Sequence, residues 1–523
     1  MFNSRVKNRS TLQRAVPLKR AMLPRQYGAA SYAGAQALFS DNSNGTTSSR
    51  VVSNRTGHPF SRNDENKHLY SYEQKIKGAF SGIEVVLQEI SSVQHDSGFI
   101  ERAQQLARSK LGFELPEHLL EDSWVKPLDI GSLYCWCVFE TFRHMSDDFF
   151  MNSPLSAPND NEFQTFLEQC GFHLMDVSPC ADGRLAHVIR YVLRLPHKVV
   201  RRKSYAGAMF DVDDSLQKWV KTEMLRYREG KPNAADAPTR YLKVAAYHFS
   251  SSHPDTEGCA AHGSDVQRAA QAAIGRLEDF RQGVENSFCC GASIDLLLVG
   301  IDTDNDVLRL HLPDANGDID ASRYIDAAEL YDATYNESAS NAQACITSYI
   351  EKHSEEQGAS LPDEGMKKLA AYLLCKNISQ IDYVRQYHQG CYSDIGHQEC
   401  FIGMGIGFEE VRLRNLTYFA YLSTVEEGAQ DMDVGIKIFT KLNANRGLPI
   451  PVVIRNDYHS KVPAARERAE ARCQQLDAAL RSRYSDYAEK GLLHTLLMVR
   501  DCSSDGRAEM VGCSLLPANQ ETH

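Results

Sequence analysis

The sequence lacks any hydrophobic run that approaches the roughly 18 residues needed to span a bilayer, so we expect no membrane partner. Its first residues are basic and polar and lack the hydrophobic segment of a secretory signal, which predicts that the chain is not secreted. Its 14 cysteines lack the regular spacing of a disulfide framework. We therefore expect them to serve as metal ligands or small buried side chains in a reducing cytosol.

Positive charge is scarce beyond the N-terminal segment. Residues 1–62 hold ten Lys and Arg and a single acid, Asp41, which gives this segment a net charge of +9. The whole chain carries −11, so the remainder carries −20. An acidic body argues against nucleic acid as a partner, because affinity for phosphates depends on clustered positive charge.

The length of 523 residues is too great for one domain, since domains run to about 100–200 residues. Composition and hydrophobic spacing predict an α/β protein with an N-terminal all-helical domain. The predicted parts are a disordered basic arm (1–65), a helical domain (66–150), a first α/β domain (151–335) and a second α/β domain (336–523).

The helical domain is predicted from apolar residues spaced three and four apart, as in Ile76, Phe80, Ile83 and Leu87. The segment 133–139 is apolar on all sides and predicts a buried helix, so its two cysteines are expected in the core rather than at a metal.

The central part alternates predicted strands and helices. A strand over 174–177 ends just before Cys180, a helix is expected over 185–192, and a second strand over 241–248 ends at His248. Sites in α/β sheets usually form at the carboxyl ends of strands, so this edge is where we expect the chemistry.

A faint internal repeat follows. The strand expected over 296–302 is echoed by 496–501, each after an amphipathic helix, and 452–459 takes the place of the strand ending at His248. The second copy has no Cys-x-Asp-x-Arg pattern and no cysteine 11 residues after His459. We therefore expect a degenerate repeat that binds no metal.

The run Cys180-Ala-Asp182-Gly-Arg184, with the isolated His248 and Cys259, supplies a Cys/His/Cys ligand set for one zinc ion per chain. Three protein ligands are typical of catalytic zinc, which leaves its fourth position to water, whereas structural sites are closed by four. The carboxylate and the guanidinium that follow the first ligand suit a pair that orients a group at the open position.

This pattern resembles the β-type carbonic anhydrases, which combine a Cys/His/Cys zinc with an Asp-Arg dyad. Ten residues separate His248 from Cys259 here, in place of the usual two. With strings such as CADGRLAHVIRYVLRLP and GFEEVRLRNLTYFAYLSTVEEG, the chain is similar to the carboxysomal shell carbonic anhydrases from about residue 70 to its C-terminus.

The resemblance implies reversible hydration of CO₂ to bicarbonate in the carboxysome of a bacterial cytoplasm, supplying CO₂ to Rubisco. It implies a zinc-bound hydroxide as nucleophile, oriented by Asp182, with Arg184 holding that carboxylate ionised. It also implies docking of the N-terminal arm to Rubisco, association with shell proteins, and packing of the second α/β domain against the first. A homodimer or higher homo-oligomer is implied as well, with an interface that the second domain helps to form.

Several assignments stay open. His253 and His262 are alternatives to His248 as the nitrogen ligand. His397 is either a proton shuttle or an ordinary polar residue. The cluster 201–203, Arg-Arg-Lys, could hold an anionic metabolite, although a carboxylate of the same chain is the default partner.

Two other functions compete with a carbonic anhydrase. One is a different zinc hydrolase, above all a nucleobase deaminase, but the signature His-x-Glu with Pro-Cys-x-x-Cys is missing, because Ala-Asp-Gly follows Pro179-Cys180. The other is a non-catalytic carboxysome scaffold in which zinc only staples the fold.

Overall fold

The computed structural model describes most of the chain beyond the N-terminal arm. The described residues are 58–121, 123–151, 160–196, 200–234, 238–287, 293–356, 362–408, 412–420, 428–504 and 506–517. All of them belong to one compact unit, Thr56–His523. Most of the predicted arm therefore lies outside the described residues. None of the described helices is long and apolar enough to cross a membrane.

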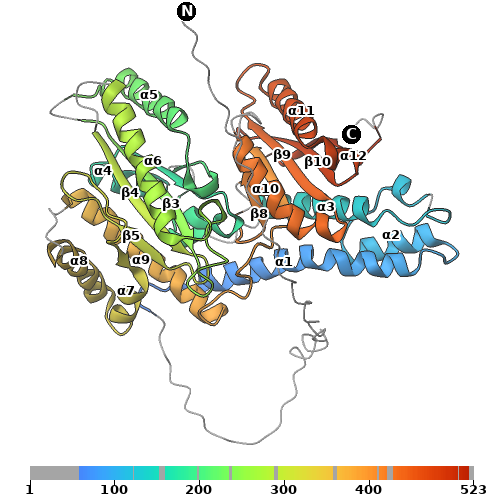
Figure 1. Ribbon diagram of the computed structural model, residues 1–523, viewed down its shortest axis with the longest axis horizontal. Coiled ribbons are helices and arrows are strands. Elements are labelled where there is room, and N and C mark those ends of the chain that lie inside the picture. Colours follow the sequence, from blue (N-terminus) through green and yellow to red (C-terminus); the bar gives the residue numbers. More distant parts are fainter. Residues whose placement is uncertain are drawn as a thin grey trace, which may run out of the picture. The chain divides into compact units, whose positions relative to one another are not determined.

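The N-terminal helical region is confirmed. It consists of α1 (Asn63–Ser92), α2 (Phe99–Lys110) and α3 (Ile130–Met151), drawn in blue and cyan in Figure 1. Helix α1 buries residues at intervals of three and four, which makes one apolar face. In α3, Cys135 and Cys137 are fully buried core side chains, as predicted.

The first sheet has six strands in the order β2-β1-β3-β4-β5-β6. Their bounds are β1 (Leu174–Pro179), β2 (Arg201–Arg202), β3 (Arg240–Phe249), β4 (Ser293–Asp302), β5 (Leu308–His311) and β6 (Ile325–Asp326). β2, β1, β3 and β4 run parallel, whereas β5 and β6 are antiparallel additions. The predicted strands over 174–177 and 241–248 are confirmed as β1 and β3.

Helices cover this sheet because β1, β3 and β4 are apolar along most of their length, as strands buried on both faces are. They are α4 (Asp160–Gln169), α5 (Val212–Arg228), α6 (Val266–Ser287), α7 (Ala327–Thr334), α8 (Ala339–Glu356) and α9 (Glu364–Tyr387). Apolar residues of α8 and α9, such as Ile346 and Leu373, lie in the same core as the sheet. The predicted domain boundary after residue 335 stays a prediction. α8 and α9 follow that boundary in sequence but pack with the first sheet.

The second sheet has the order β11-β10-β9-β7-β8. Its strands are β7 (Phe401–Ile406), β8 (Thr417–Ala420), β9 (Ile450–Tyr458), β10 (Leu493–Asp501) and β11 (Glu509–Cys513). β8, β7, β9 and β10 are parallel and β11 is antiparallel. Read from β8 to β11, the order and directions are those of β2 to β5 in the first sheet.

The two faces of the second sheet pack against different helices. Because side chains alternate along a strand, Val453 of β9 joins the core of the N-terminal helices, whereas Val452 and Ile454 face the opposite core. That opposite core includes α10 (Ala429–Leu442), α11 (Ala465–Arg483) and side chains of the short α12 (Ser485–Glu489). The N-terminal helices thus complete the second α/β unit, in orange and red in Figure 1.

The regular helix expected over 185–192 is wrong. A 3₁₀ turn at Gly183–Leu185 is followed by a π-helical turn at Val188–Val192, and Arg194 then adopts a left-handed backbone with φ of 50°. All five side chains of the π-helical turn are buried, so they do not form the single apolar stripe that the spacing suggested. Packing on every side decided the path of this segment.

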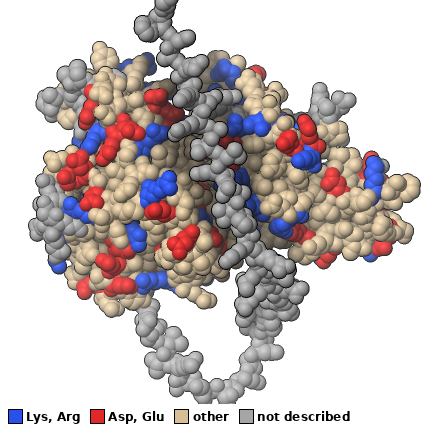
Figure 2. Space-filling view, viewed as in Figure 1, with Lys and Arg blue, Asp and Glu red and all other residues tan. Residues whose placement is uncertain are grey.

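Charge on the surface is mixed. Figure 2 shows Lys and Arg side chains interspersed with Asp and Glu over the described part of the face in view. On that face the acidic side chains are scattered rather than gathered over one element.

Candidate metal centre

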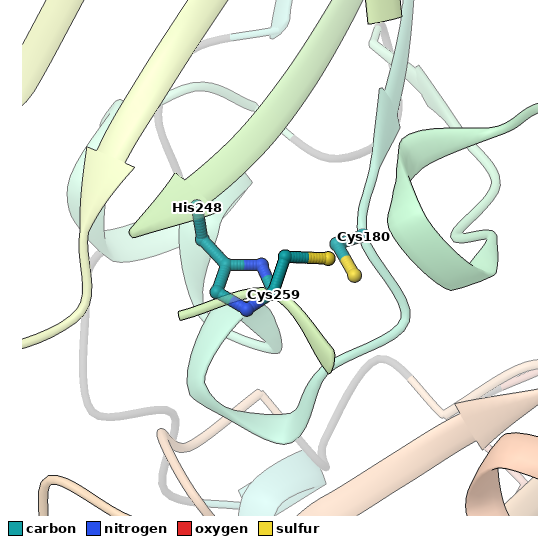
Figure 3. A group of neighbouring side chains, drawn as sticks. All are labelled: Cys180, His248 and Cys259. Atoms are coloured by element: carbon teal, nitrogen blue, oxygen red, sulfur yellow. The ribbon is translucent and has the colours of Figure 1, made fainter. Parts of the chain in front are cut away.

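Three predicted ligands meet at the carboxyl edge of the first sheet. Cys180 directly follows β1, His248 is the last residue but one of β3, and Cys259 precedes the 3₁₀ turn Ala260–His262. All three are buried, and one ligand atom of each lies within 4.8 Å of the others. Figure 3 shows the two sulfur atoms and the imidazole gathered at one point.

Backbone groups support the first thiol. The N–H of Gly207 donates to Cys180 Sγ at 3.3 Å, and Gly207 has a left-handed φ of +66°. The His262 ring nitrogen Nε2 is 3.1 Å from the Gly207 carbonyl oxygen. His262 therefore supports this loop, and His253 is exposed; neither belongs to the cluster of ligand atoms.

Two aspartates hold the long insertion between the second and third ligands. Asp304 accepts hydrogen bonds from the Ser250 hydroxyl at 2.9 Å and the Ser252 N–H at 2.7 Å, and Asp302 accepts from the Ser251 N–H at 3.2 Å. Both aspartates are buried at the end of β4. The insertion is thus tied to the neighbouring strand, which fixes where Cys259 lies.

The three predicted ligands fit a zinc ion. A hydrogen bond with Cys259 and burial raise the pKa of the Cys180 thiol, and that same contact lowers the pKa of Cys259. Burial lowers the pKa of His248, but Asp182 and Cys180 raise it to about 9. Such a buried cluster attracts positive charge, and two sulfurs with one nitrogen are donors that suit Zn²⁺.

Beside the ligands, Asp182 and Arg184 form a buried pair. Asp182 Oδ1 accepts from Arg184 Nε at 2.9 Å, and Oδ2 accepts from Nη2 at 2.7 Å, a bidentate contact. Oδ2 also lies 3.3 Å from Nε2 of His248. Although burial raises it, the positive charges of Arg184, His397 and His248 hold the pKa of Asp182 well below its usual range.

Arg184 also joins three segments of the chain. Its side chain is fully buried, and Nη1 donates to the carbonyl oxygens of Glu257 at 2.6 Å and Ile395 at 3.1 Å. These residues lie two positions before Cys259 and His397 respectively. The guanidinium therefore fixes the third ligand loop and the segment leading to β7 against the Asp182 carboxylate.

His397 comes from that segment. Its Nε2 lies 3.7 Å from Asp182 Oδ2, and its Nδ1 lies 3.0 Å from Glu399 Oε1. The side chain is 22 % exposed, whereas Asp182 is 5 % exposed. Burial lowers the pKa of His397, but the carboxylates of Asp182 and Glu399 raise it to about 9.

Sequence reasoning missed Glu399, which accepts a hydrogen bond from the Gly183 N–H at 3.2 Å and contacts His397. The only local signal was the spacing of two between His397 and Glu399, which puts both side chains on one side of an extended segment. In the cluster 201–203, Lys203 Nζ is 3.1 Å from the Asp214 carboxylate, a partner within the same chain, whereas the side chains of residues 201 and 202 lie outside the described ones.

The glycine within Cys180-Ala-Asp182-Gly-Arg184 gives a first prediction. A Cβ at Gly183 would lie 2.6 Å from Glu399 Cγ and 2.8 Å from the Thr417 carbonyl oxygen. Gly183→Ala is therefore expected to displace the loop, lower stability by about 1–3 kcal/mol and slow turnover by up to about 10²-fold. Thermal unfolding and the steady-state rate measure the two effects.

A matched control is Gly82→Ala in α1, where an added Cβ meets nothing within 4 Å. This change is expected to leave the rate unchanged and to raise stability by about 0.5–1 kcal/mol, since glycine weakens a helix interior. Equal effects of the two substitutions would contradict the tight packing described for Gly183.

Three family models match the chain. They are described as Carboxysome Shell Carbonic Anhydrase, N-terminal (residues 58–150), catalytic domain (162–397) and C-terminal (398–515). The three ligands, the Asp182–Arg184 pair and His397 all fall within the catalytic model, whereas Glu399 is the second residue of the C-terminal one.

Curated relatives carry the same description. The chain is 53 % identical to the carboxysome shell carbonic anhydrase of Prochlorococcus marinus (strain MIT 9313), over 89 % of this chain and 91 % of the relative. It is 53 % identical to that of Parasynechococcus marenigrum (strain WH8102), over 91 % and 82 %. It is 43 % identical to that of Halothiobacillus neapolitanus (strain ATCC 23641 / c2), over 85 % and 88 %.

Proposed function

The chain belongs to the carboxysome shell carbonic anhydrase family, and from this premise we propose that it hydrates CO₂ at a zinc ion held by Cys180, His248 and Cys259. It is a carbonic anhydrase of the carboxysome, interconverting CO₂ and bicarbonate. The zinc, the roles of the surrounding residues and the supply of CO₂ to Rubisco are the parts that we propose.

The observation that carries the proposal is the state of Asp182. Both of its carboxylate oxygens are hydrogen-bonded to Arg184, although Oδ2 lies only 3.3 Å from the ligand His248. A carboxylate held in this way faces the metal position without having to ligate it. This supports a site with three protein ligands and an open fourth position, which is the catalytic arrangement.

Zinc bound by these residues would lower the pKa of a water molecule from about 15.7 towards 7 and so provide the nucleophile near neutral pH. Asp182 would accept a hydrogen bond from that nucleophile and aim its lone pair at CO₂. Arg184 keeps Asp182 ionised through the bidentate contact, and its further bonds to Glu257 and Ile395 hold the pair in place.

We propose His397 as the group that takes the proton away. Of the three charged or titratable side chains next to Asp182, His397 is the most exposed, whereas Arg184 and His248 are buried. His397 therefore connects the buried centre with solvent. A nearby Zn²⁺ would lower the pKa of the ring from its raised position, because a cation disfavours imidazolium. The proton would then be released more readily near neutral pH.

We propose that the second α/β unit is a repeat of the first and that it binds no zinc. Support comes from the matching order and direction of β8 to β11 and β2 to β5. We further propose, on family grounds, a homodimer or higher oligomer, docking of the N-terminal arm to Rubisco and contact with shell proteins.

Removal of the metal tests this function. Dialysis against a chelator is expected to abolish CO₂ hydration, and one equivalent of Zn²⁺ per chain is expected to restore it, as measured by stopped flow with a pH indicator. A chain with zinc that is inactive but remains folded would favour the scaffold function. CO₂ hydration that persists after the zinc has been removed would contradict a catalytic role for zinc.

A further inference from the structure

Glu399 is a buried carboxylate that the proposed chemistry has not used. It lies two residues before β7, at the start of the second α/β unit, and its side chain is fully buried. Oε1 accepts from the Gly183 N–H at 3.2 Å and lies 3.0 Å from His397 Nδ1. Oε2 has no hydrogen-bond partner within the described ranges of the chain.

Such a charge needs a nearby cation, because an unpaired buried carboxylate costs several kcal/mol. The positive groups around it are the His397 ring and the Arg184 guanidinium. Arg184 is already committed to Asp182 by two hydrogen bonds, and Glu257 Oε2 lies 3.8 Å from its Nη1. His397 is therefore the group in direct contact with Glu399 that can gain and lose a positive charge.

The geometry of His397 indicates which of its ring nitrogens carries the proton. With Nδ1 bound to Glu399, the neutral ring carries its proton on Nδ1 and presents the Nε2 lone pair, which lies 3.7 Å from Asp182 Oδ2. A carboxylate paired with one ring nitrogen fixes the tautomer and stabilises the imidazolium that forms when the other nitrogen accepts a proton.

A second metal ion is the competing explanation, since Asp182, His397 and Glu399 have ligand atoms within 4.8 Å of one another. Both Asp182 oxygens, however, already accept hydrogen bonds from Arg184. A divalent cation there would lie next to a buried guanidinium and near the proposed zinc, so its binding would be opposed by charge repulsion.

We propose that Glu399 is a positioning residue for proton release, acting through His397; this rests on the proposed carbonic anhydrase site. As the attacking water loses its proton, its O–H bond breaks and an N–H bond forms at His397 Nε2, directly or through a bridging water. Glu399 holds Nδ1–H throughout. The Nε2 proton then passes to a buffer base, which restores the neutral ring.

The test uses the zinc-loaded full chain and ¹⁸O exchange followed by mass spectrometry. This method measures separately the interconversion of CO₂ and bicarbonate and the release of labelled water, which needs proton transfer. Glu399→Gln keeps the shape and an oxygen at the Oε1 position that can accept from both Gly183 N–H and His397 Nδ1–H, but it loses the negative charge that stabilises the imidazolium. We expect release of labelled water to fall about tenfold and interconversion to change less than twofold.

Further measurements separate positioning from a structural role. Added imidazole buffer should restore water release in Glu399→Gln, because it replaces the impaired shuttle. Glu399→Gln should also have no further effect in a His397→Ala background, since a residue that acts through another is not additive with it. Zinc content should stay at one per chain, and the thermal midpoint should stay within a few degrees of the original.

Several results would overturn the inference. Parallel loss of both exchange rates with a lowered thermal midpoint would make Glu399 a structural residue that holds Gly183. Unchanged water release in Glu399→Gln would exclude a role in proton transfer, and two zinc ions per chain would favour the second-metal site. Absence of interconversion in the unmodified zinc-loaded chain would instead contradict the proposed function, and this inference with it.

Discussion

Cys180→Ser is expected to remove zinc from the protein and to lower CO₂ hydration by at least about 10³-fold. Cys180 is one of three proposed ligands that are all buried, with candidate ligand atoms within 4.8 Å of one another, so no other side chain of the cluster can replace it. Serine lacks the thiolate that zinc prefers, and without zinc the pKa of water stays near about 15.7 rather than 7. Metal analysis and stopped-flow hydration measure the two losses.

A matched control is Cys473→Ser in α11. Cys473 is also fully buried, and its sulfur accepts from Asn456 Nδ2 at 3.3 Å and donates to the Met498 carbonyl at 3.4 Å. A serine hydroxyl can make the same two contacts, so zinc content and rate should be unchanged. A Cys180→Ser protein that keeps its zinc and its rate would refute the ligand assignment.

The second large effect is expected from Asp182→Asn, which should keep zinc but slow hydration by about 10²-fold or more. The asparagine amide would present N–H groups to Arg184 in place of one of the two accepting oxygens. It would also accept more weakly from the nucleophile. The change should therefore separate catalysis from metal binding, because Asp182 is not proposed as a ligand.

Asp176→Asn controls for the cost of disturbing a buried ion pair. Asp176 lies on β1, and its carboxylate is 2.9 Å from Lys243 Nζ, with both side chains fully buried. This change should lower stability, since breaking a buried pair costs about 3–5 kcal/mol, but it should leave the rate per folded, zinc-loaded molecule unchanged. Equal hydration rates in Asp182→Asn and Asp176→Asn would show that Asp182 has no catalytic role, as the scaffold function requires.

Much of the site could be predicted because its residues follow local patterns. The apolar run of β1 ends at Cys180, that of β3 ends at His248, and parallel strands bring their carboxyl ends to one edge. The spacing of Cys180, Asp182 and Arg184 is enough to predict that the Asp-Arg pair lies beside the proposed ligand Cys180. The burial of the two cysteines in α3 also followed from local apolar residues.

Other features depend on contacts between distant segments. Glu399 reaches Gly183 across 216 positions of sequence, and no periodicity near either residue indicates that contact. The segment 185–192 was expected to be a regular helix, because its spacing suits one, but burial on all sides gives 3₁₀ and π turns instead. α8 and α9 likewise pack with the first sheet, although they follow it in sequence.

The most direct test of a catalytic zinc is a crystal structure with anomalous diffraction measured on both sides of the zinc absorption edge. We predict one zinc peak per chain between Cys180, His248 and Cys259, a non-protein oxygen in the fourth position, and Asp182 still bound to Arg184. A peak closed by a fourth protein ligand, or zinc bound elsewhere, would contradict this account.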